Sequence, residues 1–294
     1  MHEIKLYELN LETGATQQHV HLMPAGWDEL SAEQLKVVSE ARFILFACGE
    51  EYYTEVDAAM RFRLLQQLAG IPDRLMRHMP DAGDLTFETE PTADDLLNGR
   101  DKPRFKLMAE LDWVFAAPKY DKSLLPALEH DGSIWNGPDD FLNHMNLDQW
   151  SWVTSLVNAL RNPDAPPEAP GEPARLDMVM GAMYTPDGRP FDSLIIEVHA
   201  ARFATMPLGE KLAALLNYEA LYASVPEQYP RVFPYDNEGR ASPFGPFGTI
   251  IDIAKNGVLG DRNAAQKERM HDGMMLMEHS LFQQEESERQ AKKK

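Results

Sequence analysis

The stretch FGPFGTIIDIAKNGVLGD, residues 244–261, is the part of the sequence that most resembles a phosphate-binding loop. A loop of the Walker type needs a lysine and a serine or threonine directly after its last glycine, where they reach the terminal phosphates and magnesium. Gly248 is instead followed by a threonine and two isoleucines. The spacing G-x-G-x-x-G of a dinucleotide site is also absent. The glycines therefore do not predict a nucleotide site.

These glycines are better interpreted as helix boundaries. We expect a loop to end at Gly248 and a short helix to cover residues 249–256. Gly257 then takes the left-handed conformation that ends many helices, and Asp261 caps the next helix.

The histidines form no complete metal site. His19 and His21 lie two apart on a predicted strand, so they share a face, but no third ligand can be named. The pair Glu197 and His199 lacks the i, i+4 spacing of helical zinc ligands. His271 and His279 are eight residues apart, about 12 Å along a helix, which is too far to share an ion.

The cysteine and the serines likewise form no recognisable catalytic motif. Cys48 is the single cysteine, so one chain can build neither a disulfide nor a thiolate metal cluster. No serine lies in a G-x-S-x-G elbow. The tryptophans could line a ligand cleft, although burial in a core is their commoner role; they are Trp27, Trp113, Trp135, Trp150 and Trp152. We therefore expect no enzyme, no catalytic residue, no metal and no cofactor.

The elements that hold these residues are mostly helices. Alternation of Ile4, Leu6 and Leu9 with polar residues, followed by a glycine turn, predicts an N-terminal β-hairpin. Ser31 with Gln34, and Asn146 with Gln149, are typical of capped helix starts. Further helical spacing covers residues 54–69, 194–206 and 208–225. The fold class expected is mainly α, an irregular helical protein with a β-hairpin.

A proline-rich stretch, PDAPPEAPGEP at residues 163–173, is the best candidate boundary. Proline fixes φ and removes hydrogen-bond donors, so an extended linker or surface loop is expected there. The sequence then divides into residues 1–162, this linker, and residues 174–294, which either fold separately or pack as one domain.

The last predicted helix, from about Arg262, carries a methionine-rich stripe. Met270, Met274, Met277 and Leu281 follow alternating spacings of four and three, and Met275 and Phe282 widen this face. Methionine side chains are pliable, so the stripe is a candidate partner-binding face. Ordinary core packing is the alternative.

The composition limits the class of partner. The formal net charge is -19, from 47 acidic and 28 basic side chains. Such a surface repels nucleic-acid phosphates and anionic membranes and favours solubility or a basic partner. We see no signal peptide and no apolar run near the roughly 20 residues that span a bilayer, so we expect a cytoplasmic protein.

Four stretches resemble a known group of proteins: PAGWDELSAEQLKVV, FLNHMNLDQWSWVTSLV, ARFATMPLGEKLAALLNYEALYASVPEQYPRVF and FGTIIDIAKNGVLGDRNAAQKERMHDGMMLME. Together they resemble proteins from prophage tail modules of Bacteroidetes bacteria, encoded between the tail-tube and tape-measure genes. That position is typical of tail assembly chaperones.

The resemblance implies a helper in phage tail assembly, with the tape measure or tail tube as its helical client. It carries no catalytic residues. A permanent minor structural subunit or adaptor of the tail is one alternative, and a small-molecule-binding protein or enzyme is another.

Overall fold

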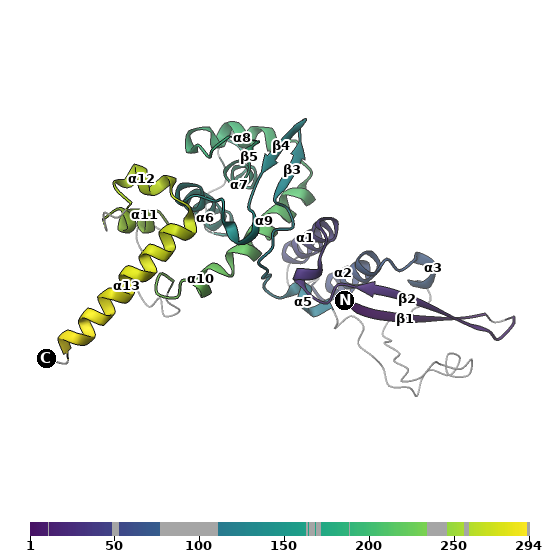
Figure 1. The fold of residues 1–294 in the computed structure, drawn as a ribbon. Helices are drawn as coiled ribbons and strands as arrows, with labels where there is room; N and C mark the ends of the chain where they lie inside the picture. The colour runs from purple at the N-terminus through teal and green to yellow at the C-terminus, as the bar shows by residue number, and fades with distance from the viewer. Residues whose placement is uncertain are drawn as a thin grey trace. The chain divides into compact units, whose positions relative to one another are not determined.

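The computed structural model describes residues 1–10, 12–48, 53–76, 111–162, 164, 168, 172–187, 189–233, 246–255 and 259–292. Most of these residues are helical, and a two-stranded sheet lies at the N-terminus, which confirms the expected fold class (Figure 1). The chain divides into two compact units, Met1–Pro118 and Lys119–Lys294.

The first unit begins with the predicted hairpin. β1, His2–Leu9, pairs antiparallel with β2, Thr16–Met23, so that Ile4 lies opposite His21. A 3-10 turn, Trp27–Glu29, leads into α1, Ala32–Ala47. The helices α2, Tyr53–Ala69, α3, Asp73–Met76, and α5, Asp112–Phe115, complete the described part.

Local capping sets the start of α1. Ser31 accepts a hydrogen bond from the Gln34 amide at 3.2 Å, and the Gln34 side chain accepts one from the Ser31 amide at 2.9 Å. This reciprocal pair confirms the predicted capping box. The helix packs on α2, and the core of the unit contains Met23, Leu35, Val38, Leu64, Leu65, Ile71, Leu111 and Val114.

The second unit is a set of helices packed around α7. Its longer helices are α6, Leu147–Arg161, α7, Arg175–Met183, α8, Ile196–Phe203, α9, Leu208–Tyr222, α11, Pro246–Lys255, and α13, Met270–Lys292. The short helices are α10, Val225–Gln228, and α12, Arg262–Lys267. α7 contacts α6, α8 and α9.

A small sheet in this unit was not predicted. β3, Ala127–His130, pairs with β4, Ser133–Asn136, which also pairs with β5, Thr185–Pro186. Asp131 and Gly132 join β3 to β4 with φ values of 53° and 66°. Two successive left-handed residues favour a tight hairpin turn, for which Asp-Gly is well suited.

The C-terminal helix differs from the prediction, because it is interrupted. α12 ends at Lys267 and α13 starts at Met270. Between them the Glu268 carbonyl accepts from the Leu147 amide, and the Met270 amide donates to the Met145 carbonyl, at 2.9 and 2.8 Å. These backbone groups pair with a distant segment, so they cannot continue the helix.

Of the other expected boundaries, two helix caps are confirmed and two expectations fall outside the described residues. Asn146 and Asp261 cap α6 and α12 as predicted, accepting from the amides of Gln149 and Ala264. Gly257 and most of the proline-rich stretch 163–173 lie outside the described residues. The helices flanking that stretch, α6 and α7, pack together within the second unit, whereas the division between the two units falls after Pro118.

Candidate interaction surface

The base of α13 belongs to the core of the second unit. Met270 and Met274, the first two members of the predicted partner-binding face, are both 0% exposed. Gly273 allows this close packing, because a Cβ there would come within 2.5 Å of Leu147 Cδ1 and 3.1 Å of Ile253 Cδ1. α13 thus packs closely on α6 and α11, and the two buried methionines at its base are not available to a partner.

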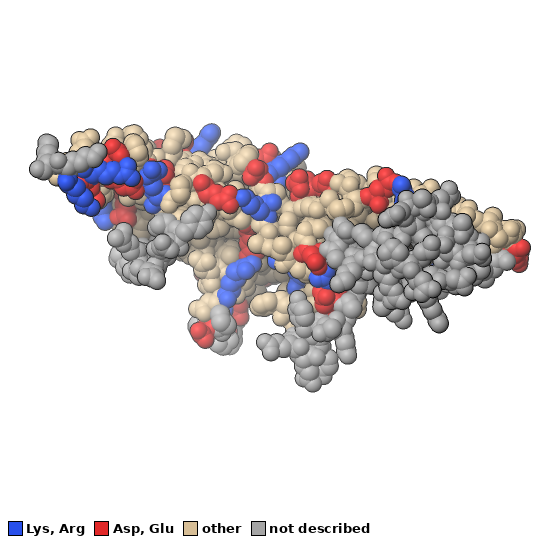
Figure 2. Space-filling view, turned by 90° about the horizontal axis from the view of Figure 1, so that it is seen from below, with Lys and Arg blue, Asp and Glu red and all other residues tan. Residues whose placement is uncertain are grey.

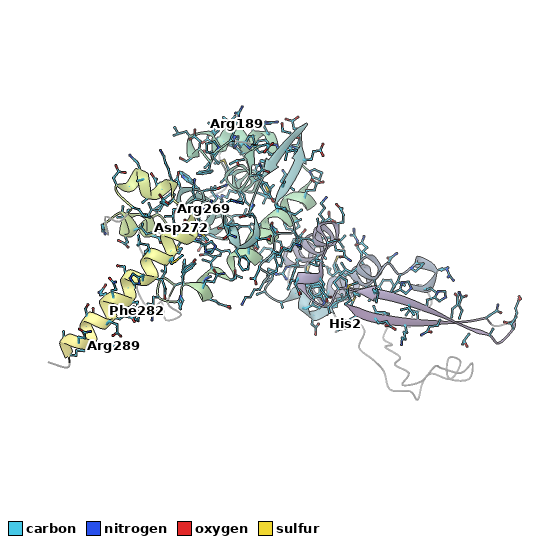
Figure 3. All side chains as sticks on the ribbon, in the orientation of Figure 1. His2, Arg189, Arg269, Asp272, Phe282 and Arg289 are labelled. Atoms are coloured by element: carbon cyan, nitrogen blue, oxygen red, sulfur yellow. The ribbon has the colours of Figure 1, made fainter. Side chains whose placement is uncertain are left out.

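The outer half of α13 is more open. Met277 and Leu281 are half-buried, and Phe282 is 43% exposed. Phe282 lies far along the helix from Asp272, toward the C-terminus (Figure 3). The Arg231 guanidinium lies 5.1 Å from the centre of the Phe282 ring. The predicted partner-binding face is therefore buried in the core at the start of α13 and partly exposed toward the end of the helix.

Arg231 is fixed over this part of α13 by two carboxylates. Its Nη1 lies 2.7 Å from Glu278 Oε1, and its Nε lies 3.3 Å from Glu285 Oε2. These hydrogen bonds, first to Glu278 and then to Glu285, raise the pKa of Arg231. Basic and acidic side chains stand side by side along the helix (Figure 2). Phe282 remains partly exposed beside Arg231.

His271 joins the same face of α13 to two other segments. The helical period places His271, Met275 and Phe282 on one face. The Tyr229 hydroxyl lies 2.6 Å from His271 Nδ1, and His271 Nε2 faces the Phe141 carbonyl. A carbonyl only accepts, so in the neutral imidazole Nε2 donates to it and Nδ1 accepts from the tyrosine. Burial raises the pKa of Tyr229, which favours the protonated hydroxyl that this arrangement needs. His271 therefore acts as a structural bridge.

Phe141 has an unusual backbone at this bridge. Phe141 and Leu142 have φ values of 57° and 60°, in the left-handed region that non-glycine residues seldom adopt. The Phe141 amide donates to the Asp121 carbonyl at 2.9 Å, and the Leu142 side chain is fully buried. These contacts hold the strained pair in place. The Phe141 side chain remains 38% exposed.

Met275 and Phe282 are exposed on one face of α13, and the exposed Phe141 belongs to a segment whose backbone contacts His271 on that face. We call these three residues the Phe–Met surface: Phe141, Met275 and Phe282. Met275 is 59% exposed. Met275 and Phe282 were recognisable from their helical spacing. Phe141 and Arg231 were missed, because their neighbours along the sequence carry no signal that they meet α13.

The predicted histidine positions form other contacts. His19 Nε2 lies 3.0 Å from Glu8 Oε2 across the hairpin. His279 contacts Gln283, whereas His271 forms the bridge described above. His199 is buried against the Trp135 ring, with ring centres 5.1 Å apart. Within the described residues, no group of three or more His, Cys, Asp or Glu side chains could hold a metal ion.

The remaining candidates for chemistry are in packing roles. Cys48 Sγ lies 3.0 Å from the Leu45 carbonyl of its own helix. Trp27, Trp135 and Trp150 are buried. Trp113 packs edge-on against Trp27, and Trp152 does so against Phe247. Trp27 and Trp113 belong to the first unit, and Trp135, Trp150 and Trp152 to the second.

Comparison with known proteins gives no relative from which a function could be transferred. No family model matches the chain, and no match was found among curated proteins or solved structures. Among the helices described, none is both long enough and apolar enough to cross a membrane.

Proposed function

We propose that this chain is a non-enzymatic assembly protein that binds a helical client in the cytoplasm. The observation that carries the proposal is the division of α13 into a buried base and an outer part that exposes Met275 and Phe282. A pliable methionine and an aromatic ring on one face suit an apolar partner helix, because the methionine adapts to different partner side chains and the ring offers a large apolar contact.

The setting proposed is the assembly of a phage tail or tail-like particle, with the tape measure or tail tube as client. This part of the proposal rests on the resemblance of four sequence stretches to prophage tail-module proteins. The acidic balance of the chain, -19, supports a role in keeping an apolar client in solution.

Affinity purification of the tagged chain from cells with an induced prophage, followed by mass spectrometry, tests this function. Enrichment of a tail protein over an untagged control is the expected result. Recovery of no tail protein would contradict the proposal. Analysis of purified particles distinguishes a chaperone from a permanent structural subunit. A structural subunit remains in the particles, whereas a chaperone does not.

A further inference from the structure

The Phe–Met surface offers apolar anchors at a spacing that fits a helix. Met275 and Phe282 are seven residues apart on one face of α13, which is about 10.5 Å along the axis. They are 59% and 43% exposed, and Phe141 adds a third apolar side chain that is 38% exposed. A partner helix with apolar residues on one face can contact such a row over two turns.

The border of this surface is acidic. Asp272 is exposed on α13, and Asp121 and Asp140 are exposed on the segments that hold Phe141. Lys122 and Arg269 are also exposed there, and Arg269 lies near Asp272 (Figure 3). Arg231, the cation nearest Phe282, is already bound by Glu278 and Glu285. The carboxylates named here, Asp121, Asp140, Asp272, Glu278 and Glu285, outnumber the cations Lys122, Arg231 and Arg269. The border therefore favours a positively charged partner.

From this combination we propose that the Phe–Met surface binds an amphipathic α-helix with apolar residues on one face and lysine or arginine on the other. The inference rests on the proposed function and specifies the chemistry of the client at one site. The apolar face of the client contacts Met275 and Phe282, and its basic residues lie near Asp272 and the Phe141 segment.

Binding of synthetic peptides to the full chain tests the inference. The probe is a fluorescent helical peptide of about 18 residues, roughly five turns, with leucine on one face and lysine on the other. One comparison peptide replaces lysine with glutamate, and a second keeps the composition but scrambles the faces. We expect saturable binding of the first peptide only, and weaker binding as the salt concentration rises.

Matched variants locate the binding site. Met275→Lys adds one positive charge to the surface, whereas Leu194→Lys adds the same charge at a residue that precedes α8 and is 89% exposed. We expect Met275→Lys to weaken peptide binding by about tenfold or more, because it removes an apolar contact and repels the peptide. Leu194→Lys and the conservative Met275→Leu should bind like the native chain.

Three results would overturn the inference: absence of peptide binding, equal binding of the acidic or scrambled peptide, or equal loss from both lysine variants. Circular dichroism of each variant checks that the helices remain folded. Capture of a tail protein from cells together with any of these three results would leave the proposed function in place and remove this surface as the site.

Discussion

At the residue scale, the packing of α8 on α7 depends on a single missing side chain. A Cβ on Gly181 would lie 2.6 Å from the Ile196 carbonyl oxygen and 2.7 Å from the Ala200 nitrogen. Both are backbone atoms, so neither can move without shifting α8. His199 lies beside this contact and hydrogen-bonds with the Gly181 backbone.

Gly181→Ala should therefore destabilise the second unit, even though alanine is a better helix former. We expect a loss of about 1–3 kcal/mol, the usual range for overpacking. Gly273→Ala is the matched comparison, because its new Cβ meets only side-chain atoms of Leu147 and Ile253. Urea unfolding, monitored by tryptophan fluorescence, measures the free energy of unfolding of both variants. A Gly273→Ala loss larger than that of Gly181→Ala would contradict this explanation.

His199 should make the second unit sensitive to acid. Burial lowers the pKa of His199 from its ordinary value of 6.5. The unfolded chain then binds a proton more readily than the folded chain. The stabilising contribution is fully present above about pH 6.5 and is lost as the pH falls through the lower pKa of the folded state.

Urea unfolding at several pH values tests this prediction. Replacement His199→Gln should reduce the loss of stability between neutral and mildly acidic pH. His279→Gln, at an exposed position on α13, provides the control and should keep the native pH profile. An unchanged profile in His199→Gln would show that another group causes the acid sensitivity.

At the element scale, helix starts depend on short-range capping. Ser31→Ala removes the hydroxyl that accepts from the Gln34 amide, and we expect a loss of about 1 kcal/mol. Ser287→Ala is a suitable control, because Ser287 lies inside α13 and its hydroxyl donates to the carbonyl of Gln283. Hydrogen exchange should become faster in the first turn of α1 only in Ser31→Ala. Unchanged exchange there would contradict the role of the cap.

Elements set by neighbouring residues could be predicted from the sequence. The hairpin and the starts of α1, α6 and α12 follow from alternation and from capping by Ser31, Asn146 and Asp261. The Asp131-Gly132 turn was also a local signal for β3 and β4, and it was overlooked.

Other features depend on residues far apart in the sequence. The break before α13 exists because Glu268 and Met270 pair with the backbone around Asn146, more than a hundred residues earlier. The Phe–Met surface likewise depends on contacts between distant parts of the sequence, which spacing alone does not reveal. Helical spacing identified Met275 and Phe282, but it could not separate them from the buried Met274. Only the fold shows which side of the stripe is covered.

At the scale of the whole molecule, we propose that the chain acts as a binding protein. Its described polar clusters serve the fold: His271 bridges Tyr229 and Phe141, and Arg231 holds Glu278 and Glu285. The exposed apolar residues of α13 remain to be explained by a partner. A contact from Met275 to a client helix is therefore the central claim.

Photo-crosslinking in cells with an induced prophage tests that claim most directly. A photoreactive amino acid is placed at position 275 in one variant and at position 194 in another, since Met275 and Leu194 are both exposed. We predict a crosslink to a tail protein from position 275 and none from position 194. A crosslink from position 194 alone, or no crosslink from position 275, would contradict it.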